Sequence, residues 1–199
     1  PITATFSEVV NKTGTPQLTL ETGNSDAVVN YTSGSESNTL TFNYTVAAGH
    51  VSPDLDYVAT SSLALNSGTI KDAALNAATL TLASPGATNS LGANKAIVID
   101  GVLPTITAVS TTKSDGSYTT GEEISITATF SEVVNVTGTP KITLETGDTD
   151  AVVNYTSGSE SNTLTFNYTV EAGHTSTDLD LSNSNTLILS SGTIKDTAG

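Results

Sequence analysis

The chain has 199 residues and carries 20 acidic side chains against six lysines, with no Arg, Cys, Met or Trp, so its formal net charge is -14. This charge repels phosphate backbones and anionic lipid surfaces, which argues against nucleic acid and anionic membranes as partners. The lack of Cys excludes disulfides and thiolate metal sites, and no apolar run is long enough to predict membrane insertion.

Short segments that alternate apolar and polar residues follow one another along the chain, which is typical of β-strands. The chain opens inside such a segment at residues 1–6. Clusters of Gly, Ser and Asp, at residues 114–116, 146–148, 157–159 and 190–192, predict the turns between them. The clearest further strands are expected at residues 78–83, 96–99, 104–110, 123–130, 141–145, 151–155, 163–170 and 186–189.

An internal repeat sets the domain organisation. Residues 27–46 read AVVNYTSGSESNTLTFNYTV, and residues 151–170 are identical to them at an offset of 124. The same offset aligns residues 2–6 with 126–130 and residues 67–72 with 191–196. A period of this length matches one whole domain rather than a solenoid repeat.

The repeat predicts two domains, at residues 1–102 and 103–199. Pro1 aligns with Ser125 and Gly199 with Leu75. The first copy is therefore expected to lack its N-terminal strand, and the second copy its C-terminal strands. With seven to eight antiparallel strands in a complete repeat, the sequence predicts an all-β fold of tandem immunoglobulin-like β-sandwiches.

Several motifs in fixed order resemble the bacterial Ig-like repeats of large secreted surface proteins and adhesins. They are FSEVVNVTGTP, ITLETG, NTLTFNYTV, SGTIKD and GANKAIVIDGVLPTIT, and together they cover essentially the whole chain. The resemblance implies an extracellular, non-catalytic extender module in a long array, stiffened by calcium at domain junctions. One departure is that His50 and His174 stand where family members commonly carry an acidic residue or Asn.

Acidic residues near the expected domain edges are candidate calcium ligands. An Asp-Leu-Asp segment places two carboxylates on one side of an extended chain, and sandwich topology brings the lower edge of one domain to the upper edge of the next. Calcium takes six to eight oxygen ligands in irregular geometry, and cadherins use a similar arrangement of acids. The junction candidates are Asp54, Asp56, Asp100, Glu132 and Asp196, and the matching positions of the other copy are Asp178, Asp180, Glu8 and Asp72.

Catalysis finds little support in the sequence. His50 and His174 are one repeat position, expected in an exposed Ala-Gly-His turn, and no nucleophile elbow surrounds any Ser. Two alternatives to the extender role stay open. One is a subunit of an extracellular fibre, sheath or surface layer, which joins other copies through exposed strand edges. The other is a carbohydrate-binding module, which needs an exposed aromatic platform.

Overall fold

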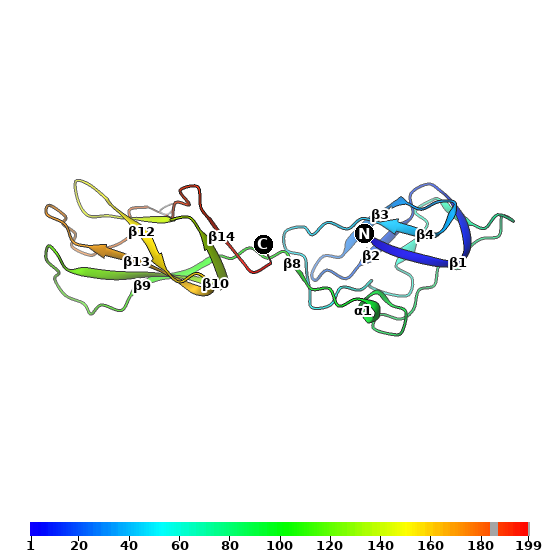
Figure 1. Ribbon diagram of the computed structural model, residues 1–199, viewed down its shortest axis with the longest axis horizontal. Helices are drawn as coiled ribbons and strands as arrows, with labels where there is room; N and C mark the ends of the chain where they lie inside the picture. The colour runs from blue at the N-terminus through cyan, green and yellow to red at the C-terminus, as the bar shows by residue number, and fades with distance from the viewer. Residues whose placement is uncertain (184–186, 199) are drawn as a thin grey trace. The chain divides into compact units, whose positions relative to one another are not determined.

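The computed structural model describes residues 1–183 and 187–198. The chain divides into two compact units, which we call unit 1 (Pro1–Val102) and unit 2 (Leu103–Gly199). Each unit has a separate hydrophobic core. The fold is all-β with antiparallel pairing, as the alternating pattern predicts (Figure 1).

Unit 1 contains eight strands and one short helix. In chain order these are β1 (Ile2–Thr13), β2 (Gln17–Leu20), β3 (Ala27–Ser33), β4 (Ser37–Phe42), β5 (Val51–Ser52), β6 (Leu63–Ala64), β7 (Thr69–Lys71), α1 (Leu91–Asn94) and β8 (Ile99–Asp100). Six strands form one sheet in the order β6-β2-β3-β4-β1-β7, and β5 pairs with β8.

Unit 2 contains six strands in its described residues. They are β9 (Ile106–Thr111), β10 (Glu123–Thr137), β11 (Lys141–Leu144), β12 (Ala151–Ser157), β13 (Ser161–Thr169) and β14 (Thr193–Lys195). The sheet order is β11-β12-β13-β10-β14. Strand β9 pairs with β10 along the edge opposite β13 (Figure 1).

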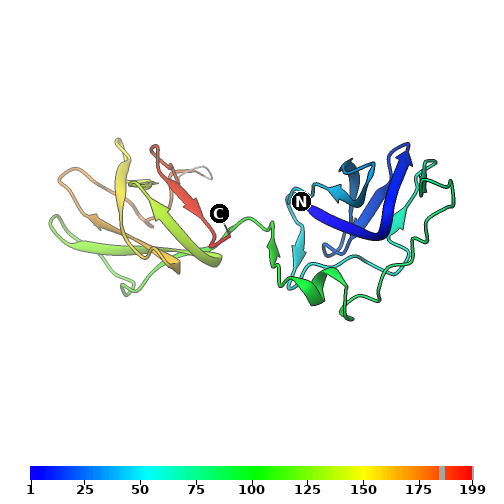
Figure 2. The ribbon, with the colours of Figure 1, turned by 45° about the vertical axis from the view of Figure 1, so that its right-hand side comes forward.

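The long strands β1 and β10 each change partners part-way along their length. The first half of β1 pairs with β4 and its last residues pair with β7, with a register shift between Thr5 and Val10. The matching shift in β10 lies between Thr129 and Val134. Irregular pairing of this kind bends a strand, and Figure 2 shows the sharp bend of β1. Each main sheet is thereby strongly curled.

The cores follow from the alternation in these strands. Along β13, Leu164, Phe166 and Tyr168 are buried, and the residues between them are half-buried. In the matching strand of unit 1, Leu40 and Phe42 are buried in the same way. Apolar side chains on alternate positions therefore fill the inside of each curled sheet.

Two predicted strands differ from the structure. Residues 78–83 form no strand and make only scattered backbone hydrogen bonds, from Ala78 N to the Ile70 carbonyl and from Leu82 N to the Thr60 carbonyl. The segment thus contacts β7 only at its first residue, and the alternating pattern does not continue into a paired strand. Of residues 96–99, only Ile99 belongs to a strand. Part of the predicted strand 186–189, Thr186, lies outside the described residues, while Ile188 forms an isolated bridge with Lys141.

Within residues 1–183 and 187–198, no helix has the length and apolar character needed to cross a membrane.

Candidate functional site

Asp56 is the most deeply buried of the candidate metal ligands in unit 1, with 9% of its surface exposed. Its Oδ1 accepts hydrogen bonds from Tyr57 N at 2.9 Å and Leu91 N at 3.2 Å. Its Oδ2 accepts from Gly86 N at 3.0 Å. These donors lie in the loop before α1 and at its first turn, so one carboxylate ties residues 86–91 to the segment that follows β5.

The environment of Asp56 favours its charged form. Burial opposes ionisation, but hydrogen bonds from the backbone of Gly86 and Tyr57, the Ser90 hydroxyl and the Gly92 N–H outweigh it, so the pKa of Asp56 lies below its ordinary value. The neighbouring Tyr57 has a raised pKa because of burial first and the Asp56 charge second. The site is therefore an anionic carboxylate held by backbone N–H groups.

Asp54 and Asp100 also accept backbone hydrogen bonds. Asp54 is exposed, and its Oδ1 accepts from Ile97 N at 3.2 Å. Both carboxylates approach Gly92. A Cβ atom at this position would lie 3.5 Å from Oδ2 of Asp54 and 3.1 Å from Oδ2 of Asp56. Asp100 ends β8, and its Oδ1 accepts from Val102 N at 3.1 Å.

The matching acids of unit 2 have fewer partners. Asp178 and Asp180 are exposed, and Oδ1 of Asp180 accepts only the Leu181 N–H, at 2.7 Å, among the hydrogen bonds described for its side chain. The reason is that the loop which donates to Asp56, residues 84–97, has no copy among residues 103–199. Asp56 and Asp180 therefore occupy the same position in the repeat but have different hydrogen-bond partners.

The remaining acids lie in pairs, one beside β10 and β14 and one beside β1 and β7. The register of β10 and β14 pairs Asn135 with Lys195, so Glu132, before Asn135, and Asp196, after Lys195, lie at the same end of this strand pair. Asp196 is buried and its Oδ1 accepts from Ala198 N at 2.8 Å. In unit 1, Glu8 and Asp72 hold the same positions relative to β1 and β7.

Asp72 closes a tight turn. Its two carboxylate oxygens accept from Asn76 N and Asn76 Nδ2, each at 2.8 Å. The Asn76 side-chain hydrogen bond, followed by the Asn76 backbone bond, lowers the pKa of Asp72. Like Asp56, Asp72 therefore accepts hydrogen bonds from nearby groups with its charged carboxylate and so fixes the local backbone conformation.

Among the residues that the structure describes, no group of three or more His, Asp or Glu side chains is arranged to hold a metal ion. The predicted calcium site combines acids of both units at their junction, and it stays a prediction.

Each unit carries a Tyr–His pair that sequence reasoning missed. Tyr44 Oη lies 2.9 Å from His50 Nδ1, and Tyr168 Oη lies 2.8 Å from His174 Nδ1. A backbone N–H, of Ala47 or Glu171, also donates to each Nδ1 at 3.3 Å. Because a backbone N–H can only donate, Nδ1 is an acceptor, and the proton of the neutral ring is on Nε2.

This pairing corrects the expectation of exposed turn histidines. Both rings are half-buried and stack on the tyrosine, with ring centroids 5.8 and 5.7 Å apart. Burial raises the pKa of Tyr44 and, together with the charge of Glu171 as the smaller cause, that of Tyr168. The Tyr-x₅-His spacing, repeated in both copies, was the signal available in the sequence.

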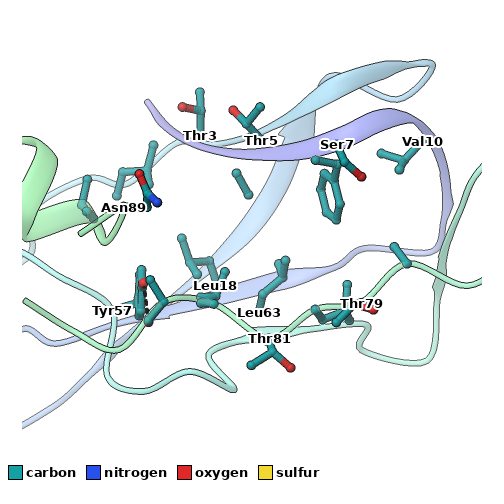
Figure 3. A pocket seen from close by; sticks show the side chains of 18 of the residues that line it. Thr3, Thr5, Ser7, Val10, Leu18, Tyr57, Leu63, Thr79, Thr81 and Asn89 are labelled. Carbon is teal, nitrogen blue, oxygen red and sulfur yellow. Dashed lines mark hydrogen bonds between the residues drawn. The ribbon is translucent and has the colours of Figure 1, made fainter. Parts of the chain in front are cut away.

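A cavity of unit 1 lies beside β1. It measures about 1000 Å³ and lies between β1 and the segment 77–83, with Leu18, Tyr57 and Leu63 on its inner wall (Figure 3). Thr3 and Thr5 lie on the opposite face of β1 (Figure 3). The cavity is therefore bordered by the apolar face of a sheet.

Comparison of the chain with protein-family models, with curated proteins and with solved structures finds no match.

Proposed function

We propose that this chain is a non-catalytic structural segment of a long, repetitive extracellular protein, in which each 124-residue repeat acts as a spacer. The observation that carries the proposal is the exact repetition of residues 27–46 at 151–170 in two units with separate cores. Duplication of a whole domain adds length to a protein, whereas a single active site gains nothing from it.

The use of acidic side chains supports the same role. Asp56, Asp72 and Asp100 hold backbone N–H groups within their own unit. Each His Nδ1 holds a turn in place. The polar groups that a catalytic site would need are thus engaged in local structure.

We further propose that complete repeats adopt an immunoglobulin-like sandwich and lie at a bacterial cell surface. The support is the resemblance of the motifs and the curled antiparallel sheet of each unit. A complete repeat would combine the β9 strand seen in unit 2 with residues 73–102 seen in unit 1, and so close the curled sheet on both sides.

Calcium at the junction belongs to this proposal. The proposed ligands are Asp54, Asp56, Asp100, Glu132 and Asp196, and Asp56 already accepts three backbone hydrogen bonds. Extracellular modules bind calcium with dissociation constants of about 0.1–1 mM. The site should therefore fill under extracellular conditions and empty with chelator.

The spacer role is tested by adding whole repeats. Chains lengthened by one, two or three periods of residues 1–124 should gain a constant increment in maximum dimension in small-angle X-ray scattering. With calcium the increment should grow and the melting temperature rise, and Asp100→Asn should remove both effects. A particle that becomes more compact as repeats are added would contradict the spacer role, whereas no response to calcium would contradict the junction site alone.

The carbohydrate-binding alternative has less support. All ten aromatic residues are buried or half-buried. Tyr31 packs edge-to-face on Phe42 in unit 1, and Tyr155 packs in the same way on Phe166 in unit 2. A sugar-stacking platform needs exposed rings. Binding to a glycan array at micromolar concentration would restore this alternative.

A further inference from the structure

The histidine of each Tyr–His pair closes the turn that carries it. We call residues 47–50 the His50 turn and residues 171–174 the His174 turn. In unit 1, Ala47 N donates to Nδ1 of His50 at 3.3 Å, and His50 N donates to the Ala47 carbonyl at 3.1 Å. Tyr44 Oη lies 2.9 Å from the same Nδ1. One ring nitrogen thus accepts from the backbone and from the tyrosine.

The two units build this turn alike although its neighbours differ. The distance from the backbone N–H donor to Nδ1 is 3.3 Å in both units, and the Tyr Oη to Nδ1 distances are 2.9 and 2.8 Å. The His50 turn contacts Gly101, whereas Val170, directly before the His174 turn, is hydrogen-bonded to Gly121 and Glu122. The arrangement is therefore a property of the turn itself.

In unit 1 the turn holds the end of the unit. Gly49 N donates to the Gly101 carbonyl and Gly101 N donates to the His50 carbonyl, each at 2.8 Å. A Cβ on Gly101 would lie 2.4 Å from the Ala47 carbonyl oxygen, so this close approach requires glycine. The next residue, Val102, is the last of unit 1. The path of the chain out of unit 1 is thus fixed on the His50 turn.

A proton on Nδ1 would remove the acceptor that closes the turn. Histidine is the side chain that ordinarily changes charge between about pH 5 and pH 8, and the charged ring carries N–H on both nitrogens. The tyrosine hydroxyl can rotate and accept from the charged ring, because a hydroxyl both donates and accepts. The Ala47 N–H can only donate, so its bond to Nδ1 is lost and two N–H groups face each other.

The two histidines are the side chains that respond in this pH range. The chain contains no Cys and only two His, and Asp, Glu and Lys ordinarily titrate outside the range. The charged residue nearest the His50 turn is Asp100, on β8 opposite Val51. Around His174 the charged residues are Glu122 and Glu171 and, along the wall of the adjoining cavity of unit 2, Lys113, Asp115, Asp178 and Asp180.

From this geometry we infer that the His50 turn is an acid-sensitive switch, closed while Nδ1 of His50 is unprotonated and open when Nδ1 carries a proton. The bond from Ala47 N is present at neutral pH and lost as the pH falls, and opening of the turn releases Gly101. The His174 turn responds in the same way and releases the backbone of Gly121 and Glu122. The inference goes beyond the spacer role, because it makes the order of the chain at the end of a unit depend on pH.

Amide hydrogen exchange of the full chain, followed by NMR in calcium-free buffer at about pH 8 and about pH 5, tests this switch. After correction for the intrinsic effect of pH on exchange, protection of Gly49 and Gly101 should fall at least about tenfold at the lower pH, as expected for the loss of one hydrogen bond. Protection in β4 should not change. The nitrogen chemical shifts of His50 report the proton on Nδ1 in the same samples. Full protection with a protonated ring, or a ring that stays neutral at the lower pH, would overturn the inference.

Two substitutions hold the turn in its two states. His50→Asn puts an amide oxygen in the place of Nδ1, and this oxygen accepts at either pH, so Gly49 and Gly101 should stay protected throughout. His50→Phe keeps an aromatic ring beside Tyr44 but has no acceptor, so both amides should exchange rapidly at either pH. The His174 turn is unchanged in both variants, and the protection of Gly121 should still fall in acid. A fall in protection of Gly101 as large in His50→Asn as in the original chain would overturn the inference.

Discussion

At the scale of single residues, the two copies allow one side chain to be compared in two environments. Asp56 and Asp180 occupy the same repeat position, but only Asp56 receives hydrogen bonds from a loop and from α1. The difference arises from the neighbouring chain and not from the Asp-Leu-Asp motif. A residue's role in this protein therefore depends on which part of the repeat surrounds it.

This comparison gives a matched pair of variants. Asp56→Asn should destabilise unit 1 by about 1–3 kcal/mol, because the amide turns an N–H group toward backbone donors and leaves a buried group unpaired. Urea denaturation measures the loss, and hydrogen exchange should locate it in residues 84–97. Asp180→Asn should change unit 2 by less than about 0.5 kcal/mol. Equal effects of the two substitutions would show that the loop contacts contribute nothing to the stability of unit 1.

At the scale of elements, the β3–β4 hairpin depends on one glycine. Gly34 has φ of 107°, and a Cβ at this position would lie 2.0 Å from the Thr39 carbonyl oxygen. Gly158 repeats the arrangement in the β12–β13 hairpin, with φ of 112° and a distance of 2.1 Å to the Thr163 carbonyl oxygen. The hairpins therefore need glycine both for its backbone conformation and for the close approach of the facing strand.

Gly49 has the backbone conformation that favours glycine but no facing atom close to it. It has φ of 84°, but a Cβ there would meet no atom within 4 Å. We expect Gly49→Ala to cost about 1–2 kcal/mol from the backbone conformation alone, and Gly34→Ala to cost about 1–3 kcal/mol more because of the steric clash. Urea denaturation with each variant measures both values. If Gly34→Ala were no worse than Gly49→Ala, the facing carbonyl would have to move aside without cost.

Much of the strand pattern could be predicted from the sequence because alternation reports directly on a half-buried strand. Thus β11, β12 and β13 lie close to their predicted ranges. The segment 78–83 alternates just as clearly, yet it forms no strand, because hydrogen bonding depends on a neighbour that alternation cannot reveal. The bend in β1 was missed for a similar reason: the change of partner between Thr5 and Val10 is a property of the pairing.

The candidate site was less predictable than the fold. The sequence predicted acids near the domain edges, and the register of β10 and β14 places Glu132 and Asp196 at the same end of this strand pair. The sequence could not show that Asp56 accepts hydrogen bonds from the backbone of Gly86 and Leu91, because these donors are 30 and 35 residues away. The pairing of Tyr44 with His50 likewise depends on how the turn folds.

At the scale of the whole molecule, stability should be divided between two cores. Leu40 and Leu164 lie at the same repeat position within 20 identical residues, and both are 0% exposed. Replacing either with Ala removes buried methyl groups and leaves a cavity, at a cost of about 2–5 kcal/mol. Each core cluster contains residues of one unit only, so Leu40→Ala should reduce hydrogen-exchange protection in unit 1, and Leu164→Ala in unit 2. The double variant should show the two losses added together. Loss of protection in both units from either single substitution would mean that the chain unfolds as one cooperative body. Unit 1 and unit 2 would then not be independently stable domains of a spacer.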